Sequence, residues 1–424
     1  MREMKNSGVA WIGDVPENWE IVKIGQLFQC RNVKVNDTDF QPLSVSKGGI
    51  VPQMENVAKS DANDNRKQVL TGDFVINSRS DRKQSCGVSK LDGSVSLINT
   101  VLYGFDKDRV IPEYNNYLLK NYGFAEEFYR WGHGIVADLW TTRWQEMKNI
   151  EIPVPSIKTQ EDILSALRIK SKNISLLIFN QEQQIEKLKQ YKQSLITEVV
   201  TKGLNPDMPM KDSGIEWIGI ISAIHNIYRL KYLLNSQMLY GANEAGSFYT
   251  NNAVRYIRIT DITEDNKLKD SAENLYLSIE KAKPYILKDK DVLFARSGAT
   301  VGKAFMYLNE YGKSAFAGYL IKAECNTQKL LPEYLFYYTQ SSLYEYWKNM
   351  IFIQATIQNI GANKYSNMPI IQMSLDEQNQ IVKFLDDKCA KIDRLIAIKQ
   401  EKINKLNDYK KSLIYEYVTG KKEV

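Results

Sequence analysis

An internal repeat limits what this chain can fold into more than any other feature of its sequence. Three segments of the first half recur in the second half in the same order, at offsets of 206, 220 and 218 residues: MKNSGVAWIG (Met4 to Gly13) as MKDSGIEWIG (Met210 to Gly219), IPEY (Ile111 to Tyr114) as LPEY (Leu331 to Tyr334), and LKQYKQSLITEVVT (Leu188 to Thr201) as LNDYKKSLIYEYVT (Leu406 to Thr419). The first pair is identical at seven of ten positions and the third at nine of fourteen. The 424 residues therefore contain two copies of one unit.

The interiors of the two copies differ. Cys30 to Asp106 and Asn235 to Ala323 show almost no alignable identity, whereas the segments around them match. One repeated architecture therefore carries two different inserts, and we expect it to present two different surfaces.

Each copy ends in a long helical pattern. From about Thr159 to Lys202 there is no Pro or Gly, and apolar residues recur at helical spacing over about 60 Å of helix. Gln181 and Gln184 interrupt the first stripe, and Lys399 and Lys402 interrupt the second. We expect the two helices to bury their stripes against each other as a coiled coil; the alternative is that each helix packs only on its own domain. The predicted stripes are Ile174, Leu177, Ile178, Ile185, Leu188, Tyr191, Leu195 and Val199, and Ile392, Leu395, Ile396, Ile403, Leu406, Tyr409, Leu413 and Tyr417.

The inserts show strand-like alternation between turn signals, and a helix is predicted after each IPEY or LPEY segment. Each copy therefore reads as an α+β domain followed by a long helix. The predicted strands are 20–28, 72–77 and 94–103 in the first copy and 254–259, 291–295 and 302–308 in the second; the predicted helices are 113–122 and 333–346.

Polar clusters occur at matching places in the two inserts. NSRSDRKQS follows an apolar strand in the first copy, and ARSGATVGK takes its place in the second, because Asp73 aligns with Asp291. WTTRW in the first copy is matched by QATIQN in the second. RYIRIT is expected to place Arg255 on one face of a strand and Arg258 on the other. Arg and Lys suit phosphates or guanine, and Asn and Gln suit adenine, so we predict DNA contacts. The candidates are Asn77, Ser78, Arg79, Ser80, Arg82, Lys83, Gln84, Thr141, Thr142, Arg143, Arg255, Arg258, Arg296, Ser297, Thr300, Lys303, Gln354, Thr356 and Gln358.

Several other classes of protein are disfavoured. No apolar run reaches eighteen residues, so a membrane span is not expected, and four scattered cysteines fit the cytoplasm. With only two histidines, a multi-histidine metal centre is not expected. Gly298 to Lys303 is one residue short of a phosphate loop and has Ala304 where Ser or Thr belongs. No catalytic or cofactor-binding residue is predicted, so the chain should be a binding subunit.

These segments together resemble the specificity subunit of Type I restriction–modification systems over the whole chain. The resemblance is carried by MKNSGVAWIG and its repeat, GDFVINSRSDRK, RSGATVGK and the end of the first long helix. It implies an α+β fold with two α/β target-recognition domains joined by two long antiparallel coiled-coil helices in a pseudo-two-fold repeat. The implied divisions are 1–155 for the first recognition domain, 156–203 for the first helix, 204–373 for the second domain and 374–424 for the second helix. The sequence departs from the pattern where PENWE (Pro16 to Glu20) has no counterpart in Ser222 to Ile227.

The resemblance also implies a function. Each domain would read one half of a bipartite, asymmetric site in double-stranded DNA. Two adenine-N6 methyltransferase subunits and restriction (motor) subunits would be the partners, and S-adenosylmethionine, ATP and Mg would be held by those partners, with no cofactor in this chain. The alternative is a duplicated coiled-coil scaffold that binds proteins without DNA specificity. The net charge of +6 and the pI near 8.8 are mild for a DNA binder, which fits contacts confined to a few loops.

Overall fold

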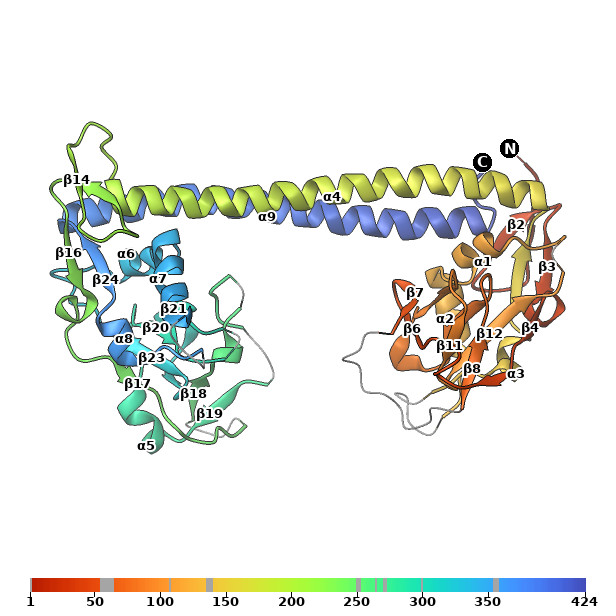
Figure 1. Cartoon of the computed structure of the whole chain (residues 1–424), viewed down its shortest axis with the longest axis horizontal. Helices are drawn as coiled ribbons and strands as arrows, with labels where there is room; N and C mark the ends of the chain where they lie inside the picture. The colour runs from red at the N-terminus through yellow and green to blue at the C-terminus, as the bar shows by residue number, and fades with distance from the viewer. Residues whose placement is uncertain are drawn as a thin grey trace. The chain divides into compact units, whose positions relative to one another are not determined.

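The chain forms two compact units. The computed structural model describes residues 2–53, 65–106, 108–134, 140–248, 253–263, 265–269, 273–298, 300–353 and 358–424. Unit 1 comprises Met1–Glu182 and Gln400–Val424, and unit 2 comprises Gln183–Lys399. Each unit therefore contains one α+β domain together with a part of both long helices (Figure 1).

The domain of unit 1 is built on a four-stranded antiparallel sheet in the order β10-β9-β12-β4. Alternate side chains of β9 enter different cores: Phe74 and Ile76 pack with the helix residue Tyr114, and Val75 packs with Val101 on the other side. Its strands and helices are β1(Met4–Asn6), β2(Asp14–Pro16), β3(Glu20–Lys23), β4(Phe28–Cys30), β5(Lys34–Val35), β6(Leu43–Ser46), β7(Gly49–Pro52), β8(Arg66–Val69), β9(Phe74–Asn77), β10(Cys86–Val88), β11(Gly93–Val95), β12(Asn99–Gly104), α1(Pro112–Leu118), α2(Tyr122–Arg130), α3(Trp144–Met147) and β13(Glu151–Val154).

The domain of unit 2 repeats this plan with the sheet β17-β23-β20-β21. Its strand β20 alternates in the same way, with Phe294 in the core beneath the helices and Leu293 in a second core. Its elements are β14(Met210–Asp212), β15(Ile220–Ser222), β16(Asn226–Arg229), β17(Leu239–Tyr240), β18(Val254–Ile257), β19(Leu275–Leu277), α5(Ile279–Ala282), β20(Val292–Ala295), β21(Ala304–Met306), β22(Ser314–Phe316), β23(Leu320–Ala323), α6(Pro332–Tyr338), α7(Ser342–Ile353), α8(Ala362–Ser366) and β24(Pro369–Gln372).

Four sequence predictions of single elements need correction. The strand predicted over 20–28 is two strands, β3 and β4, separated by the 3-10 helix Ile24–Gln26. The strand predicted over 94–103 is two strands, β11 and β12, separated by a turn. The helix predicted after each IPEY or LPEY segment is a pair of helices, α1 and α2 or α6 and α7. In each case apolar residues recur on both sides of a short connecting segment, so the pattern alone did not separate the two elements.

The two long helices are α4(Ile157–Lys202) and α9(Leu375–Val418), and they run antiparallel within each unit. In unit 1 the Lys410 ammonium donates to the Ser175 hydroxyl at 2.9 Å, and Lys170 donates to Tyr417 at 2.6 Å. In unit 2 Lys192 pairs with Asp393 at 2.7 Å, and Lys399 donates to Gln184 at 2.5 Å. Each long helix begins in the core of its own domain and ends in the core of the other copy's domain. The alternative that each helix packs only on its own domain is therefore wrong.

The buried seam between the helices differs from the predicted stripe. Leu177, Tyr191, Leu395 and Tyr409 were assigned to it, but their side chains are 46–56% exposed. The seam of α4 instead follows steps of four and three residues, as in a heptad, and includes polar Gln181. Its positions are 174, 178, 181, 185, 188, 192, 195 and 199, and the corresponding positions of α9 lie 218 residues later.

A buried glutamine joins each domain to the start of a long helix. Gln160 of α4 accepts from the Ile111 N–H at 3.0 Å and donates to the carbonyl oxygens of Arg109 (2.7 Å) and Pro155 (3.0 Å). Gln378 of α9 makes the same three bonds, from Leu331 N–H at 2.8 Å and to the carbonyl oxygens of Lys329 and Met373 at 2.9 Å. Both side chains are fully buried. Each glutamine therefore satisfies three main-chain groups that have no access to water.

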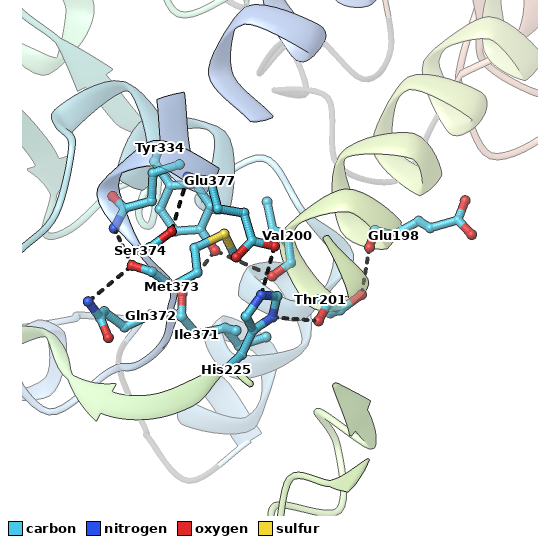
Figure 2. Close-up of polar contacts among 11 residues, drawn as sticks. Glu198, Val200, Thr201, His225, Tyr334, Ile371, Gln372, Met373, Ser374 and Glu377 are labelled. Atoms are coloured by element: carbon cyan, nitrogen blue, oxygen red, sulfur yellow. Dashed lines mark hydrogen bonds and ion pairs between the residues drawn. The ribbon is translucent and has the colours of Figure 1, made fainter. Parts of the chain in front are cut away.

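The segment Pro16 to Glu20 of unit 1 and the corresponding segment Ser222 to Ile227 of unit 2 make different contacts. In unit 2 the buried His225 places Nε2 2.9 Å from Glu377 Oε1 and Nδ1 3.4 Å from the Thr201 carbonyl oxygen (Figure 2). In unit 1 the repeat places Trp19 there, with 3% of its side chain exposed and its ring beside Gly420. We call the surroundings of Trp19 in unit 1 and of His225 in unit 2 the joint. The joint is apolar in unit 1 and polar in unit 2.

Candidate nucleic-acid interface

In unit 1 three segments converge where strand β9 ends. The Ser78 N–H donates to the Ile98 carbonyl oxygen at 3.4 Å, and the Thr142 N–H donates to the Ser78 carbonyl oxygen at 3.0 Å. The Ser80 N–H also donates to Trp140 at 2.9 Å. We call residues 77–84, 96–99 and 140–143 loop cluster 1. Its scaffold is made of main-chain hydrogen bonds, so the side chains that point outward do not have to hold it together.

Unit 2 has the same convergence where strand β20 ends. The Arg296 N–H donates to the Tyr319 carbonyl oxygen at 3.0 Å, and the Ile360 N–H donates to the Arg296 carbonyl oxygen at 2.8 Å. Ser297 and Asn359 form a β-bridge, as Arg79 and Thr141 do in unit 1. We call residues 295–298, 300–303, 317–320 and 358–361 loop cluster 2. The matching bonds confirm the alignment of NSRSDRK with ARSGATVGK.

Loop cluster 1 presents several cations. Arg79 and Arg82 both lie 3.7 Å from Asp81, and Lys83 lies 3.0 Å from Glu126. These pairs are exposed, with 67% of the Arg82 side chain accessible, so each contributes little and is readily exchanged for a phosphate. Arg143 is exposed at the start of α3, and Thr141 is half-buried beside it.

Two predicted contact residues of loop cluster 1 are turned inward instead. Ser78 is buried, and its hydroxyl lies 3.0 Å from the Thr100 hydroxyl. Thr142 is fully buried and donates to the Phe128 carbonyl oxygen at 2.7 Å. Asn77 accepts from the Arg79 N–H at 3.0 Å. These side chains support the backbone of the cluster, which leaves Ser78 and Thr142 without a surface to offer DNA.

Loop cluster 2 carries fewer cations than loop cluster 1. The Arg296 guanidinium lies over the Tyr240 ring at 5.1 Å, and Lys303 donates to the Thr263 carbonyl oxygen at 2.7 Å. Arg296 Nε and Thr300 Oγ1 are buried and have no hydrogen-bond partner among the described residues. Gln358 is exposed, while Gln354 and Thr356 lie outside the described residues.

The two arginines of RYIRIT lie outside both loop clusters. Arg255 on β18 donates to the Lys269 carbonyl oxygen and to Asn274 at 3.2 Å. Arg258 lies beyond the end of β18 and pairs with Asp261 at 2.8 Å, which raises the pKa of its guanidinium. The expectation that Arg255 and Arg258 occupy opposite faces of one strand is therefore wrong. Both are tied to their own domain.

The exposed apolar residues of the two clusters were not predicted as contacts. Leu97 and Ile98 form the turn before β12 and are 41% and 37% exposed, and Tyr319 in the turn before β23 is 64% exposed. The sequence interpretation placed Leu97 and Ile98 inside a strand. For the turn before β23, the local signal in the sequence was Gly318, which precedes Tyr319.

A cavity of about 750 Å³ adjoins loop cluster 1. Its charged lining is internally paired, since Lys83 faces Glu126 and Arg130 lies 2.8 Å from Glu127. In the part of the chain that the structure describes, no group of three or more His, Cys, Asp or Glu side chains is placed to hold a metal ion.

Comparison with known proteins finds similarity to one family. Residues 231–408 match the Type I restriction modification DNA specificity domain. The chain is 22% identical over 429 residues to the MjaVIII specificity subunit of a type I restriction enzyme from Methanocaldococcus jannaschii, covering 96% of this chain and 93% of the relative. It is 23% identical over 442 residues to a putative MjaX specificity subunit from the same organism, covering 97% and 95%.

The fold is also shared with a solved structure. A chain from a study of complex assembly and conformational transition of the type I R-M system aligns with a TM-score of 0.69 at 15% identity, covering 95% of this chain and 98% of that one. Within the described residues, no helix is both long and apolar enough to cross a membrane. The family model, the two relatives and the solved structure all come from type I restriction systems, and the chain is similar to their specificity subunits.

Proposed function

We propose that the chain is the DNA-recognition subunit of a Type I restriction–modification complex and that each unit reads one half of a bipartite, asymmetric site. The observation that carries the proposal is the pair of loop clusters. Both are held by the same main-chain bonds, yet Arg79, Arg82 and Lys83 in one are replaced by other side chains in the other. One scaffold with two different sets of side chains suits two different half-sites.

The charges favour DNA as the ligand. The cations of loop cluster 1 are exposed and only loosely paired, so binding would release counterions from the phosphates. The affinity should then fall steeply as salt rises. A protein-binding scaffold, the alternative function, would lack both this salt dependence and a sequence preference, and that outcome would contradict the proposal.

The chemistry would belong to partner subunits. We infer that two methyltransferase subunits and the restriction subunits hold S-adenosylmethionine, ATP and Mg, and that this chain only positions them. The helix pair offers matched apolar residues for docking: Leu177 and Tyr409 are exposed in unit 1, and Tyr191 and Leu395 are exposed in unit 2. Leu177 and Leu395 occupy equivalent positions of the repeat, as do Tyr191 and Tyr409, so the two units share these exposed positions, as two copies of one partner would require.

A methylation map tests the proposal most directly. Genomic DNA from cells with and without this gene would be compared for adenine methylation. We expect a split motif, two short defined sequences around an undefined gap, that disappears with the gene. A motif that persists without the gene, or a motif with a single continuous half, would contradict the proposal.

Two further measurements test its parts. Inserting one helical turn in both α4 and α9 should change the gap in the motif and leave the two half-sites unaltered. The purified chain, given DNA and methyl donor without partners, should transfer no methyl group. Methylation by the chain alone would overturn its assignment as a non-catalytic subunit.

A further inference from the structure

We propose that the turn before β12 and the turn before β23 are base-contacting elements, with Leu97 and Ile98 as the contacting side chains in unit 1 and Tyr319 in unit 2. This inference rests on the proposed function and deepens it, because it names side chains that distinguish the two half-sites.

The two turns have the same backbone closure. The Asn99 N–H donates to the Ser96 carbonyl oxygen at 3.1 Å, and the Leu320 N–H donates to the Ala317 carbonyl oxygen at 2.8 Å. Each turn is then bonded to the exit loop of the neighbouring strand, through Ile98 to Ser78 or through Tyr319 to Arg296. The turns therefore occupy equivalent places, directly beside the loops that carry the cations.

The turn in unit 2 is held rigidly from a second side. The Gly318 N–H donates to the Ala242 carbonyl oxygen at 2.7 Å, and the Ala242 N–H donates to Phe316 at 2.9 Å. Gly241 and Gly318 permit this close approach, because a Cβ on Gly318 would collide with the Asn243 side chain and one on Gly241 with the Ala317 carbonyl. A fixed backbone holds the exposed Tyr319 ring in one place, which lowers the entropy lost when the ring makes a contact.

The exposed side chains suit base edges. Apolar groups beside Arg79 or Arg296 can contact the methyl group of thymine in the major groove while the cations contact phosphates or guanine. Tyr319 adds a hydroxyl that can donate to or accept from a base. Leu97 and Ile98 offer only apolar contact. The two turns therefore differ in chemistry, as a split asymmetric target requires.

The experiment uses the full chain in complex with its methyltransferase subunits and DNA duplexes that carry the mapped target or single-base changes of it. We expect Tyr319→Ala to reduce discrimination about tenfold at one or two positions of one half-site only, because the loss of one base contact has an effect of about this size. Replacing Leu97 and Ile98 together by Ser should do the same at the other half-site. Tyr319→Phe should keep the part of the discrimination that the ring supplies.

Tyr232→Ala is the matched control, because Tyr232 is 58% exposed in the same unit but lies in the 3-10 helix Leu230–Leu233, outside loop cluster 2. Unchanged discrimination at every position in a folded Tyr319→Ala complex overturns the inference, as does an equal loss of affinity for all DNA. If Tyr319→Ala does not fold, Tyr319→Phe and the Leu97, Ile98 double variant decide. A wild-type complex with no split target would defeat the proposed function itself, which separates the two failures.

Discussion

Loop cluster 1 and loop cluster 2 differ in almost every outward side chain, whereas the parts beneath them are nearly the same. Gln160 and Gln378 make the same three hydrogen bonds, and buried Tyr114 and Tyr334 donate to Val418 and Val200 at the ends of the long helices. We call these shared parts the frame. Its exception is the joint, where Trp19 in unit 1 corresponds to His225 in unit 2. The frame is thus held by hydrogen bonds to main-chain atoms. The outward side chains of the two loop clusters can therefore differ without altering it.

The largest expected effect lies in the frame. Gln160→Ala or Gln378→Ala would leave one N–H and two carbonyl groups buried without partners, so we expect each to lower the free energy of unfolding of its unit by about 4 kcal/mol. Denaturant unfolding measures this loss. Gln183→Ala, at an exposed position of α4, should change it by less than about 0.5 kcal/mol. A large loss in one unit alone would break the equivalence of the two frames.

The joint should give the next largest effect. Trp19→His removes a large buried ring and introduces a polar group, and we expect unit 1 to lose about 3 kcal/mol. Thr159 stands in α4 where Glu377 stands in α9, so adding Thr159→Glu should recover part of the loss. Thermal unfolding of the single and double variants checks the expectation, and no recovery would mean that the two joints are not interchangeable.

An effect on binding should be confined to one half-site. Arg79→Ala should cost about 2 kcal/mol of specific DNA affinity through one half of the target, and Arg296→Ala a similar amount through the other. Titration against duplexes with one scrambled half measures each contribution. Arg229→Ala removes an exposed arginine of β16 outside the clusters and serves as the control. Equal loss at both halves from one substitution would contradict two independent readers.

The smallest effect is expected in the helix pair. Lys192 pairs with Asp393 in unit 2, while the equivalent Lys410 meets Ser175 in unit 1. Asp393→Ser should destabilise the helix pair by about 0.5 kcal/mol and Ser175→Asp should stabilise it by a similar amount, because the pairs are partly exposed. Both effects should shrink in high salt. Unfolding midpoints at two salt concentrations provide the measurement.

The sequence predicted the repeat, both long helices and the alignment of the two exit loops, because these depend on local periodicity and identity. It misassigned Leu177 and Tyr191 to the seam, since a helical period of 3.6 residues accepts them, whereas the four-and-three spacing of the paired helices excludes them. It also could not tell that the hydroxyls of Ser78 and Thr142 point inward. A turn serine serves a backbone or a ligand equally well, and only the packing around it decides.

The glutamines of the frame bond only to main-chain atoms of the segments they hold. The residues that supply those atoms differ in the two units, Arg109 against Lys329, Ile111 against Leu331 and Pro155 against Met373, and the bonds are the same. Substitutions in these segments thus leave the attachment intact. Mutational change can accumulate around such an anchor at little cost in stability, and this gives the architecture its capacity to evolve.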